Sequence, residues 1–105
     1  MRAAVQLGVA EPLLLADVAV DAPGPREVLV RTAAAGVCHS DAFALEGRFP
    51  FPVPSVMGHE SAGIVEAVGS EVTYVAPGDH VTTCLSVFCG DCDMCVSGRP
   101  YLCDK

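Results

Sequence analysis

Four cysteines lie close together near the end of the sequence, at a spacing that lets thiolates hold a single metal ion. Cys89, Cys92, Cys95 and Cys103 all fall in the stretch FCGDCDMCVSGRPYLCDK, residues 88–105. A chain with ligands at these intervals can wrap one zinc ion tetrahedrally, with Zn–S distances of about 2.3 Å. Zinc binding in small peptides contributes about 10 to 16 kcal/mol, which is comparable with the stability of a whole domain. We therefore expect a lobe over residues 88–105 that metal binding holds together.

Disulfides and an iron–sulfur cluster are the alternatives for the same cysteines. In a reducing compartment, six cysteines in a chain of 105 residues favour metal binding or catalysis over disulfides. A bacterial ferredoxin run has its fourth cysteine after three residues, followed by proline. Here the last gap is seven residues and Asp104 follows Cys103. Zinc, which needs no redox partner, is the favoured occupant, and both alternatives stay open.

Two further stretches, GVCHSD at residues 36–41 and GHE at residues 58–60, also carry side chains that do chemistry. Each is weak evidence by itself, because a cysteine beside a histidine is more often a packing feature than a catalytic pair. PGDHV at residues 77–81 follows them, and the cysteine lobe comes next. The four motifs in this order and at these intervals are not a chance combination, and we treat them as parts of one functional unit.

Short β-strands are the elements that must position these motifs. Strands are predicted in five stretches, at residues 3–7, 12–20, 26–37, 61–70 and after the Pro-Gly-Asp turn within residues 76–86. In the third of them, Val28 and Val30 alternate with polar or small neighbours. Cys84 in the last stretch is expected to pack as a small buried residue on its strand. Short strands at this spacing favour an all-β barrel or sandwich.

One short helix and one extended loop are expected between the strands. The helix is predicted in CHSDAFALEGR, residues 38–48, where Ser40 or Asp41 can cap its start and Gly47 can end it. The loop is predicted in RFPFPVPSVMGHE, residues 48–60, because its three prolines at alternate positions forbid helix.

Length and charge limit the possible functions. A chain of 105 residues with 51% apolar residues can bury one modest core, so a single domain is expected. Thirteen acidic residues against six Lys and Arg give a formal charge of −7, which argues against nucleic acid and anionic membranes as partners. The sequence has no signal-peptide pattern and no run of about 18 apolar residues, so a soluble, cytoplasmic protein is expected.

The combined motifs resemble the N-terminal catalytic domain of the zinc-dependent medium-chain alcohol dehydrogenases, over essentially all 105 residues. The resemblance implies a mainly β fold, a co-chaperonin-like and partly open β-barrel with short helices and a four-cysteine zinc lobe. It makes the zinc of the lobe a structural ion. It also implies a second, catalytic zinc, held by Cys38, His59 and a third protein ligand from further along the chain.

Roles for neighbouring residues follow from the same resemblance. Ser40 is expected to take the proton of the alcohol, and Glu60 is expected to lie behind the catalytic metal. Asp41 would orient the ligand His59, since metal-binding histidines usually donate their second ring N–H to such a partner. His39 matches the position where the family places a basic residue against the coenzyme pyrophosphate.

The chain departs from the family pattern at Phe43, where many members have a histidine that passes the proton to solvent. The proton must then leave by another path, through water or coenzyme hydroxyls, or its release will be slow. Phe49 and Leu85 are expected to narrow the substrate pocket, which would favour apolar or aromatic alcohols.

The implied activity is oxidation of an alcohol to an aldehyde or ketone, with hydride transfer to NAD or NADP and two zinc ions per complete subunit. The sequence contains no G-x-G-x-x-G fingerprint, so the Rossmann coenzyme domain is absent from residues 1–105. We therefore expect an incomplete catalytic domain, inactive alone and homo-oligomeric when full length. The alternative is a stand-alone zinc-binding interaction module without catalysis, and the next stretch of the reading frame would separate the two.

Overall fold

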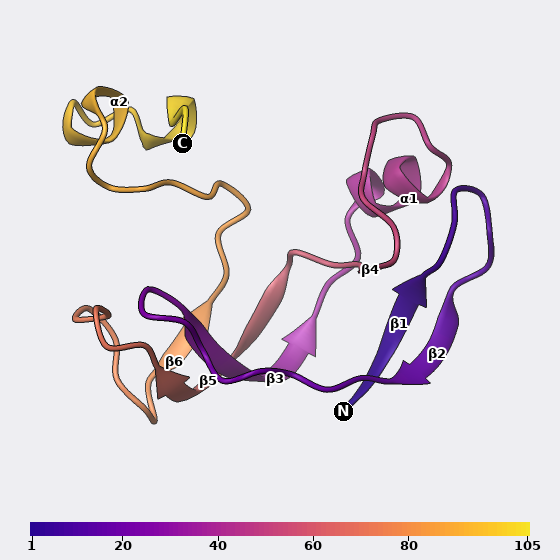
Figure 1. The fold of residues 1–105 in the computed structure, drawn as a ribbon, viewed down its shortest axis with the longest axis horizontal. Coiled ribbons are helices and arrows are strands. Elements are labelled where there is room, and N and C mark those ends of the chain that lie inside the picture. Colours follow the sequence, from indigo (N-terminus) through magenta and orange to yellow (C-terminus); the bar gives the residue numbers. More distant parts are fainter.

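The computed structural model describes residues 1–105 and shows a mainly β chain, in which two open three-stranded sheets carry short helices (Figure 1). The mainly β class predicted from the sequence is confirmed. In chain order the elements are β1 (Arg2–Gln6), β2 (Leu14–Asp17), β3 (Val28–Ala35), α1 (His39–Leu45), β4 (Ser55–Val56), β5 (Ser61–Val68), β6 (His80–Thr82), α2 (Asp93–Val96) and the 3-10 turn η1 (Pro100–Leu102).

The first sheet has the order β2-β1-β4, and both pairings are antiparallel. Ala3 and Gln6 of its central strand β1 are both buried, and Gln6 is fully buried. The amide nitrogen of Gln6 donates a hydrogen bond to the carbonyl of Ala44 on α1, at 3.4 Å. This buried polar contact holds the helix against the end of the first sheet.

The second sheet has the order β3-β5-β6 and positions the candidate site. The long strands β3 and β5 run antiparallel, with Ala35 opposite Ser61, and β6 pairs with β5 through Thr82 opposite Ala62. Val65 of β5 is 2% exposed and is one of only eight buried residues in the chain. Because neighbouring strands alternate in direction, the end of β3, the start of β5 and the end of β6 meet at one edge of the sheet.

Helix α1 begins two or three residues earlier than the predicted caps Ser40 and Asp41 would allow. Cys38 is the N-cap, in an extended conformation, while Ser40 and Asp41 already lie in the first turn. The prediction of Ser40 or Asp41 as the cap is therefore wrong. The reason is that Asp41 reaches back from the third helical position, where its carboxylate accepts the Cys38 N–H at 2.9 Å. The predicted end is confirmed, because Gly47 follows the helix with φ of +72°.

The proline-rich segment 48–60 is irregular as predicted, but it contains a short strand that the sequence pattern did not reveal. In that strand, β4, Val56 lies opposite Val5 at the edge of the first sheet. Cys84 also differs from expectation, since it is exposed rather than buried on a strand. The strand β6 ends at Thr82, and the chain then leaves the sheet as an extended linker.

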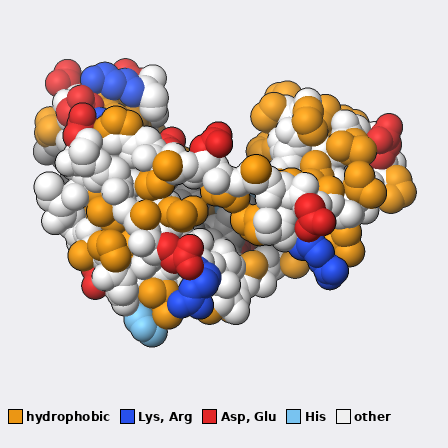
Figure 2. All heavy atoms as spheres, turned by 60° about the horizontal axis from the view of Figure 1, so that its bottom comes forward, with side chains coloured by type: hydrophobic (Ala, Val, Ile, Leu, Met, Phe, Trp, Pro, Cys, Tyr) orange, Lys and Arg blue, Asp and Glu red, His pale blue; other side chains and the backbone are white.

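The segment with α2 and η1 forms a small lobe that stands apart from both sheets (Figure 1). Figure 2 shows that the surface is hollowed between this lobe and the opposite part of the molecule, where hydrophobic side chains gather over β1 and β2. Because the lobe stands apart from the sheets, it must keep its shape largely through its own internal contacts.

None of the helices reaches the length and apolar character that a membrane-spanning helix requires.

Candidate metal sites

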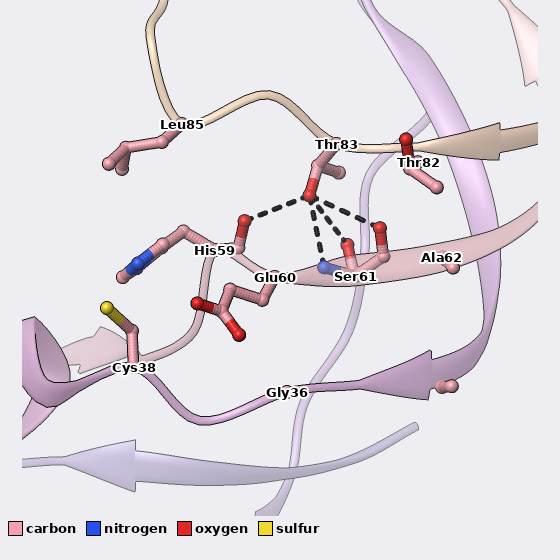
Figure 3. Close-up of a pocket in the computed structure, with 10 residues that line it drawn as sticks. Gly36, Cys38, His59, Glu60, Ser61, Ala62, Thr82, Thr83 and Leu85 are labelled. Atoms are coloured by element: carbon pink, nitrogen blue, oxygen red, sulfur yellow. Dashed lines mark hydrogen bonds between the residues drawn. The ribbon is translucent and has the colours of Figure 1, made fainter.

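Three possible metal ligands come together at the edge of the second sheet where β3 ends and β5 begins. Cys38 follows β3, and His59 and Glu60 immediately precede β5. The sulfur of Cys38, a ring nitrogen of His59 and a carboxylate oxygen of Glu60 all lie within 4.8 Å of one another. Figure 3 shows the three side chains pointing toward one another from two separate loops. One thiolate, one imidazole and one carboxylate form a donor set that zinc accepts in catalytic sites.

Both ring nitrogens of the His59 imidazole have a polar partner. Its Nδ1 lies 3.3 Å from Oδ1 of the largely buried Asp41, and its Nε2 lies 3.3 Å from Oγ of Ser40. When Nδ1 carries the proton and donates to Asp41, the Nε2 lone pair is free for a metal ion. The structure thus brings Ser40 and Asp41, both selected from the sequence, to the predicted ligand His59.

Polar contacts shift the pKa values of both Cys38 and His59. Hydrogen bonds from the hydroxyl and the backbone of Ser40 lower the pKa of the Cys38 thiol, and a smaller contribution comes from His59. The hydrogen bond to Cys38 raises the pKa of the His59 imidazole, and the charge of Asp41 adds to this shift. The Cys38 thiolate, which is the form that binds metal ions, is therefore favoured without any metal.

Glu60 reaches the site because residue 36 has no side chain. A Cβ atom on Gly36 would collide with the carboxylate of Glu60. The N–H of Gly36 also donates to the carbonyl of Glu60 at 2.7 Å, which ties the two loops together. Glu60, which is expected from the sequence to lie behind the metal, has its carboxylate close enough to Cys38 and His59 to be a third ligand itself, in addition to the ligand expected from further along the chain.

A cavity of about 480 Å³ opens beside these ligands (Figure 3). Leu85 lines it, as a substrate-pocket residue should, whereas Phe49 does not. The residues that line the cavity come from the ends of all three strands of the second sheet: Ala34, Gly36, Cys38, His59, Glu60, Ser61, Ala62, Thr82, Thr83 and Leu85. A small molecule in this space would therefore contact the metal ligands directly.

His39 lies on the exposed side of α1 and does not line the cavity. Its ring packs edge-on against Phe43, with 4.6 Å between ring centroids. The guanidinium of Arg48 lies 4.8 Å from the centroid of the same Phe43 ring. Phe43 thus carries two basic side chains on the surface of the helix, and the contact of His39 with a coenzyme stays a prediction.

The four cysteines of the lobe converge as the spacing predicts. The sulfur of Cys95 lies 3.8 Å from that of Cys89 and 3.5 Å from that of Cys92, and Cys92 and Cys103 are 4.0 Å apart. A tetrahedron with Zn–S bonds of about 2.3 Å has sulfur atoms about 3.8 Å apart. All the cysteines are free thiols. The cluster therefore has the dimensions of a zinc site rather than those of disulfides.

The surroundings of the lobe add to the case for a metal ion. Desolvation raises the pKa of the Cys95 thiol to about 12, so a bound cation is needed to keep this sulfur as a thiolate at neutral pH. The N–H of Cys92 donates to the sulfur of Cys89 at 3.3 Å. Lys105 lies 3.3 Å from Asp91 at the rim, and Arg26 donates to the carbonyl of Cys89 at 2.6 Å.

Sequence reasoning missed Arg26, Lys105 and Thr83. Arg26 and Thr83 act on residues far away in the sequence, so no local pattern could identify them. Lys105 follows Cys103 by two residues and donates to the carboxylate of Asp91. Its nearness to the cysteines in the sequence was a local signal that Arg26 and Thr83 lack.

Comparison with known proteins agrees with this geometry. A model of the alcohol dehydrogenase GroES-like domain matches residues 24–105. The S-(hydroxymethyl)glutathione dehydrogenase of Haemophilus influenzae is 48% identical over 103 residues, which covers 97% of this chain and 27% of that protein.

Solved structures are similar over nearly the whole chain. Benzyl alcohol dehydrogenase from Acinetobacter calcoaceticus has a TM-score of 0.91 and 38% identity, covering 98% of this chain and 28% of that one. An NAD-dependent alcohol dehydrogenase has a TM-score of 0.86 and 40% identity, covering 100% of this chain and 32% of that one. The chain thus spans about a third or less of the length of these relatives. Its sequence and its fold agree in one assignment: the chain belongs to the alcohol dehydrogenase GroES-like domain family.

Proposed function

We propose that residues 1–105 supply the zinc-holding part of the catalytic domain of an enzyme that oxidises an alcohol to an aldehyde or ketone. The observation that carries this proposal is the convergence of Cys38, His59 and Glu60 beside a cavity, with Asp41 behind the imidazole. A zinc ion held by these residues would act as a Lewis acid that lowers the pKa of a substrate hydroxyl. Hydride would pass to NAD or NADP.

The residues around the ligands have separate tasks in this reaction. Ser40, whose Oγ lies 3.3 Å from Nε2 of His59, accepts the proton of the substrate hydroxyl. Asp41 keeps the His59 ring in one tautomer and orientation. Leu85 forms an apolar wall of the cavity, which favours apolar or aromatic alcohols. Phe43 cannot relay a proton, so the proton would leave Ser40 by another path, through water or coenzyme hydroxyls.

The four-cysteine lobe has a structural task in this proposal. Its sulfur spacing fits one tetrahedral zinc ion, which would bring the number of zinc ions per complete subunit to two. Zinc would fold a lobe that has few apolar contacts of its own, since metal binding free energy becomes folding free energy. The ion of this lobe takes no part in the reaction.

Apart from His39, the residues that bind the coenzyme would lie outside residues 1–105. The chain spans 27% of the length of the Haemophilus relative and contains no G-x-G-x-x-G fingerprint. The proposed full enzyme joins these residues to a dinucleotide-binding domain and, as the family resemblance implies, assembles as a homo-oligomer. His39 would face the coenzyme phosphates from the exposed side of α1.

Reduced-coenzyme formation by the polypeptide encoded by the complete reading frame tests the proposal. A panel of aliphatic and aromatic alcohols is supplied with NAD or NADP, and absorbance at the reduced-nicotinamide band is followed. Cys38→Ser should abolish turnover while circular dichroism stays unchanged. Turnover that survives this substitution, or a zinc-loaded protein that oxidises none of the alcohols, would contradict the proposed function.

A further inference from the structure

Thr83 directly follows β6 and turns its hydroxyl toward the loop that carries His59 (Figure 3). Its Oγ1 lies 3.0 Å from the carbonyl oxygen of His59 and 3.1 Å from the backbone nitrogen of Ser61. The same Oγ1 lies 3.3 Å from the carbonyl oxygen of Ser61 and 3.4 Å from its Oγ. One hydroxyl thus contacts the residues on both sides of Glu60 in the sequence, His59 and Ser61.

The hydroxyl has a single hydrogen to donate, and the contacts indicate where it goes. The carbonyl of Ser61 already accepts the backbone N–H of Thr83 at 2.9 Å. The carbonyl of His59 accepts no backbone hydrogen bond, and its distance to Oγ1 is the shorter one. Thr83 therefore donates to His59 and accepts from the N–H of Ser61.

The loop is held from its other side as well. The N–H of Gly36 donates to the carbonyl of Glu60 at 2.7 Å. The backbone of residues 59–61 is thus fixed by Thr83 on one flank and by Gly36 on the other. Because this backbone carries His59 and Glu60, its position decides where their side chains meet Cys38.

We propose that Thr83 is a positioning residue of the Cys38–His59–Glu60 metal site, and that its hydroxyl sets the metal affinity of this site. The inference rests on the proposed function, since it requires these residues to bind a metal ion. Thr83 is exposed, so burial of its side chain does not account for its contacts. The β-branched side chain is stiff at χ1, which suits it to hold one hydrogen-bonding direction.

Thr82 provides a matched control. It lines the same cavity and is also exposed, but its hydroxyl makes no hydrogen bond to another residue of the chain. Replacing either threonine by valine removes a hydroxyl and keeps the shape. Only the replacement of Thr83 removes a bond to the backbone of a metal ligand.

The test is a cobalt titration of the chain after one equivalent of zinc has filled the four-cysteine lobe. Cobalt binding at Cys38 is followed by the thiolate charge-transfer band and the visible d–d bands. Thr83→Val should weaken cobalt binding about tenfold, as loss of an outer partner of a metal ligand does. Thr83→Ser should stay within about twofold of the unsubstituted chain because it keeps the hydroxyl. Thr82→Val should leave the affinity and the spectrum unchanged.

Other outcomes separate this inference from the proposed function. A chain that binds no cobalt beyond the lobe overturns the proposed function, and the role of Thr83 with it. A chain that binds cobalt, together with a Thr83→Val variant that binds it equally well, overturns the role of Thr83 alone. Protection of the Val65 amide from hydrogen exchange checks that each variant is folded. If Thr83→Val does not fold, Thr83→Ala takes its place with the same expected loss, and unchanged affinity there overturns the role equally.

Discussion

His59 and Asp41 meet through a 3.3 Å contact between Nδ1 of the imidazole and Oδ1 of the carboxylate. The second oxygen of the same carboxylate accepts the N–H of Cys38 at 2.9 Å. One side chain therefore hydrogen-bonds the N-cap residue of α1 and orients a metal ligand from the opposite loop. Since Cys38 is both the helix cap and a ligand, the start of the helix and the geometry of the metal site are coupled through Asp41.

Asp41→Asn should weaken metal binding at Cys38 and His59 by about 10- to 100-fold, because the amide keeps the size of the side chain but loses its charge. The measurement is the cobalt titration of the zinc-filled chain. Asp79→Asn is the control, since the Asp79 carboxylate accepts the N–H of Ala76 at 2.9 Å in a turn outside the site. Equal cobalt affinities for the two variants would show that Asp41 acts only on the helix.

The lowered pKa of Cys38 predicts how the metal-free chain reacts with iodoacetamide. A thiol with a lowered pKa loses its proton at a lower pH, so its alkylation rate should reach half of its plateau at a lower pH than that of an ordinary cysteine in an unstructured peptide. Ser40→Ala should move this midpoint upward, because the hydrogen bonds of Ser40 are the main cause of the shift. Peptide mass spectrometry follows Cys38 separately from the other cysteines. A midpoint at or above the ordinary value would refute the prediction.

The local parts of the structure could be predicted from the sequence. The ligands of the lobe lie within one short stretch, and tetrahedral zinc geometry restricts their spacing, so residues 88–105 were identified from the cysteines alone. The strands β1, β3 and β5 lie within short apolar stretches that are bounded by turn residues, and this pattern predicted them. The strand β4 was missed because it has only two residues and follows three prolines, so propensity could not reveal it.

The non-local parts could not be predicted in this way. Glu60 reaches Cys38 only because Gly36 leaves space for it, and Thr83 reaches His59 only because of the register between β5 and β6. A register is a property of two strands together, and neither sequence stretch states it alone. The N-cap of α1 was predicted at the wrong residue for a similar reason. Asp41 is not the N-cap, but its carboxylate accepts a hydrogen bond from the backbone N–H of the N-cap residue Cys38.

Removal of zinc from the lobe should unfold residues 88–105 and leave the two sheets intact. The lobe stands apart from the sheets, and its thiol cluster has no other source of comparable stability (Figure 1). Hydrogen exchange of Cys92→Ser, compared with the zinc-loaded chain, measures this. The amides of Val96 and Ser97 should lose their protection, while that of Val65 keeps it. Loss of protection at Val65 would mean that the lobe and the sheets fold as one unit.

Arg26 should control how firmly the lobe is attached to the rest of the molecule. Its guanidinium donates to the carbonyl of Cys89 at 2.6 Å, which is the only hydrogen bond between residues 88–105 and the rest of the chain. Arg26→Met removes this bond, and a hydrogen bond from a charged donor is worth about tenfold in a local equilibrium. We therefore expect the linker before Cys89 to open more often in the variant.

Limited proteolysis with chymotrypsin measures this opening, because Leu85 and Phe88 are exposed cleavage positions in the linker. Cleavage there should be up to about tenfold faster in Arg26→Met than in the unsubstituted zinc-loaded chain, while the zinc content stays the same. Arg31→Met is the control, since Arg31 pairs with Glu66 at 3.1 Å on the exposed surface of the second sheet, away from the lobe. Equal cleavage rates in the two variants would show that Arg26 does not hold the lobe in place. The backbone of the linker would then be enough to fix the position of the lobe.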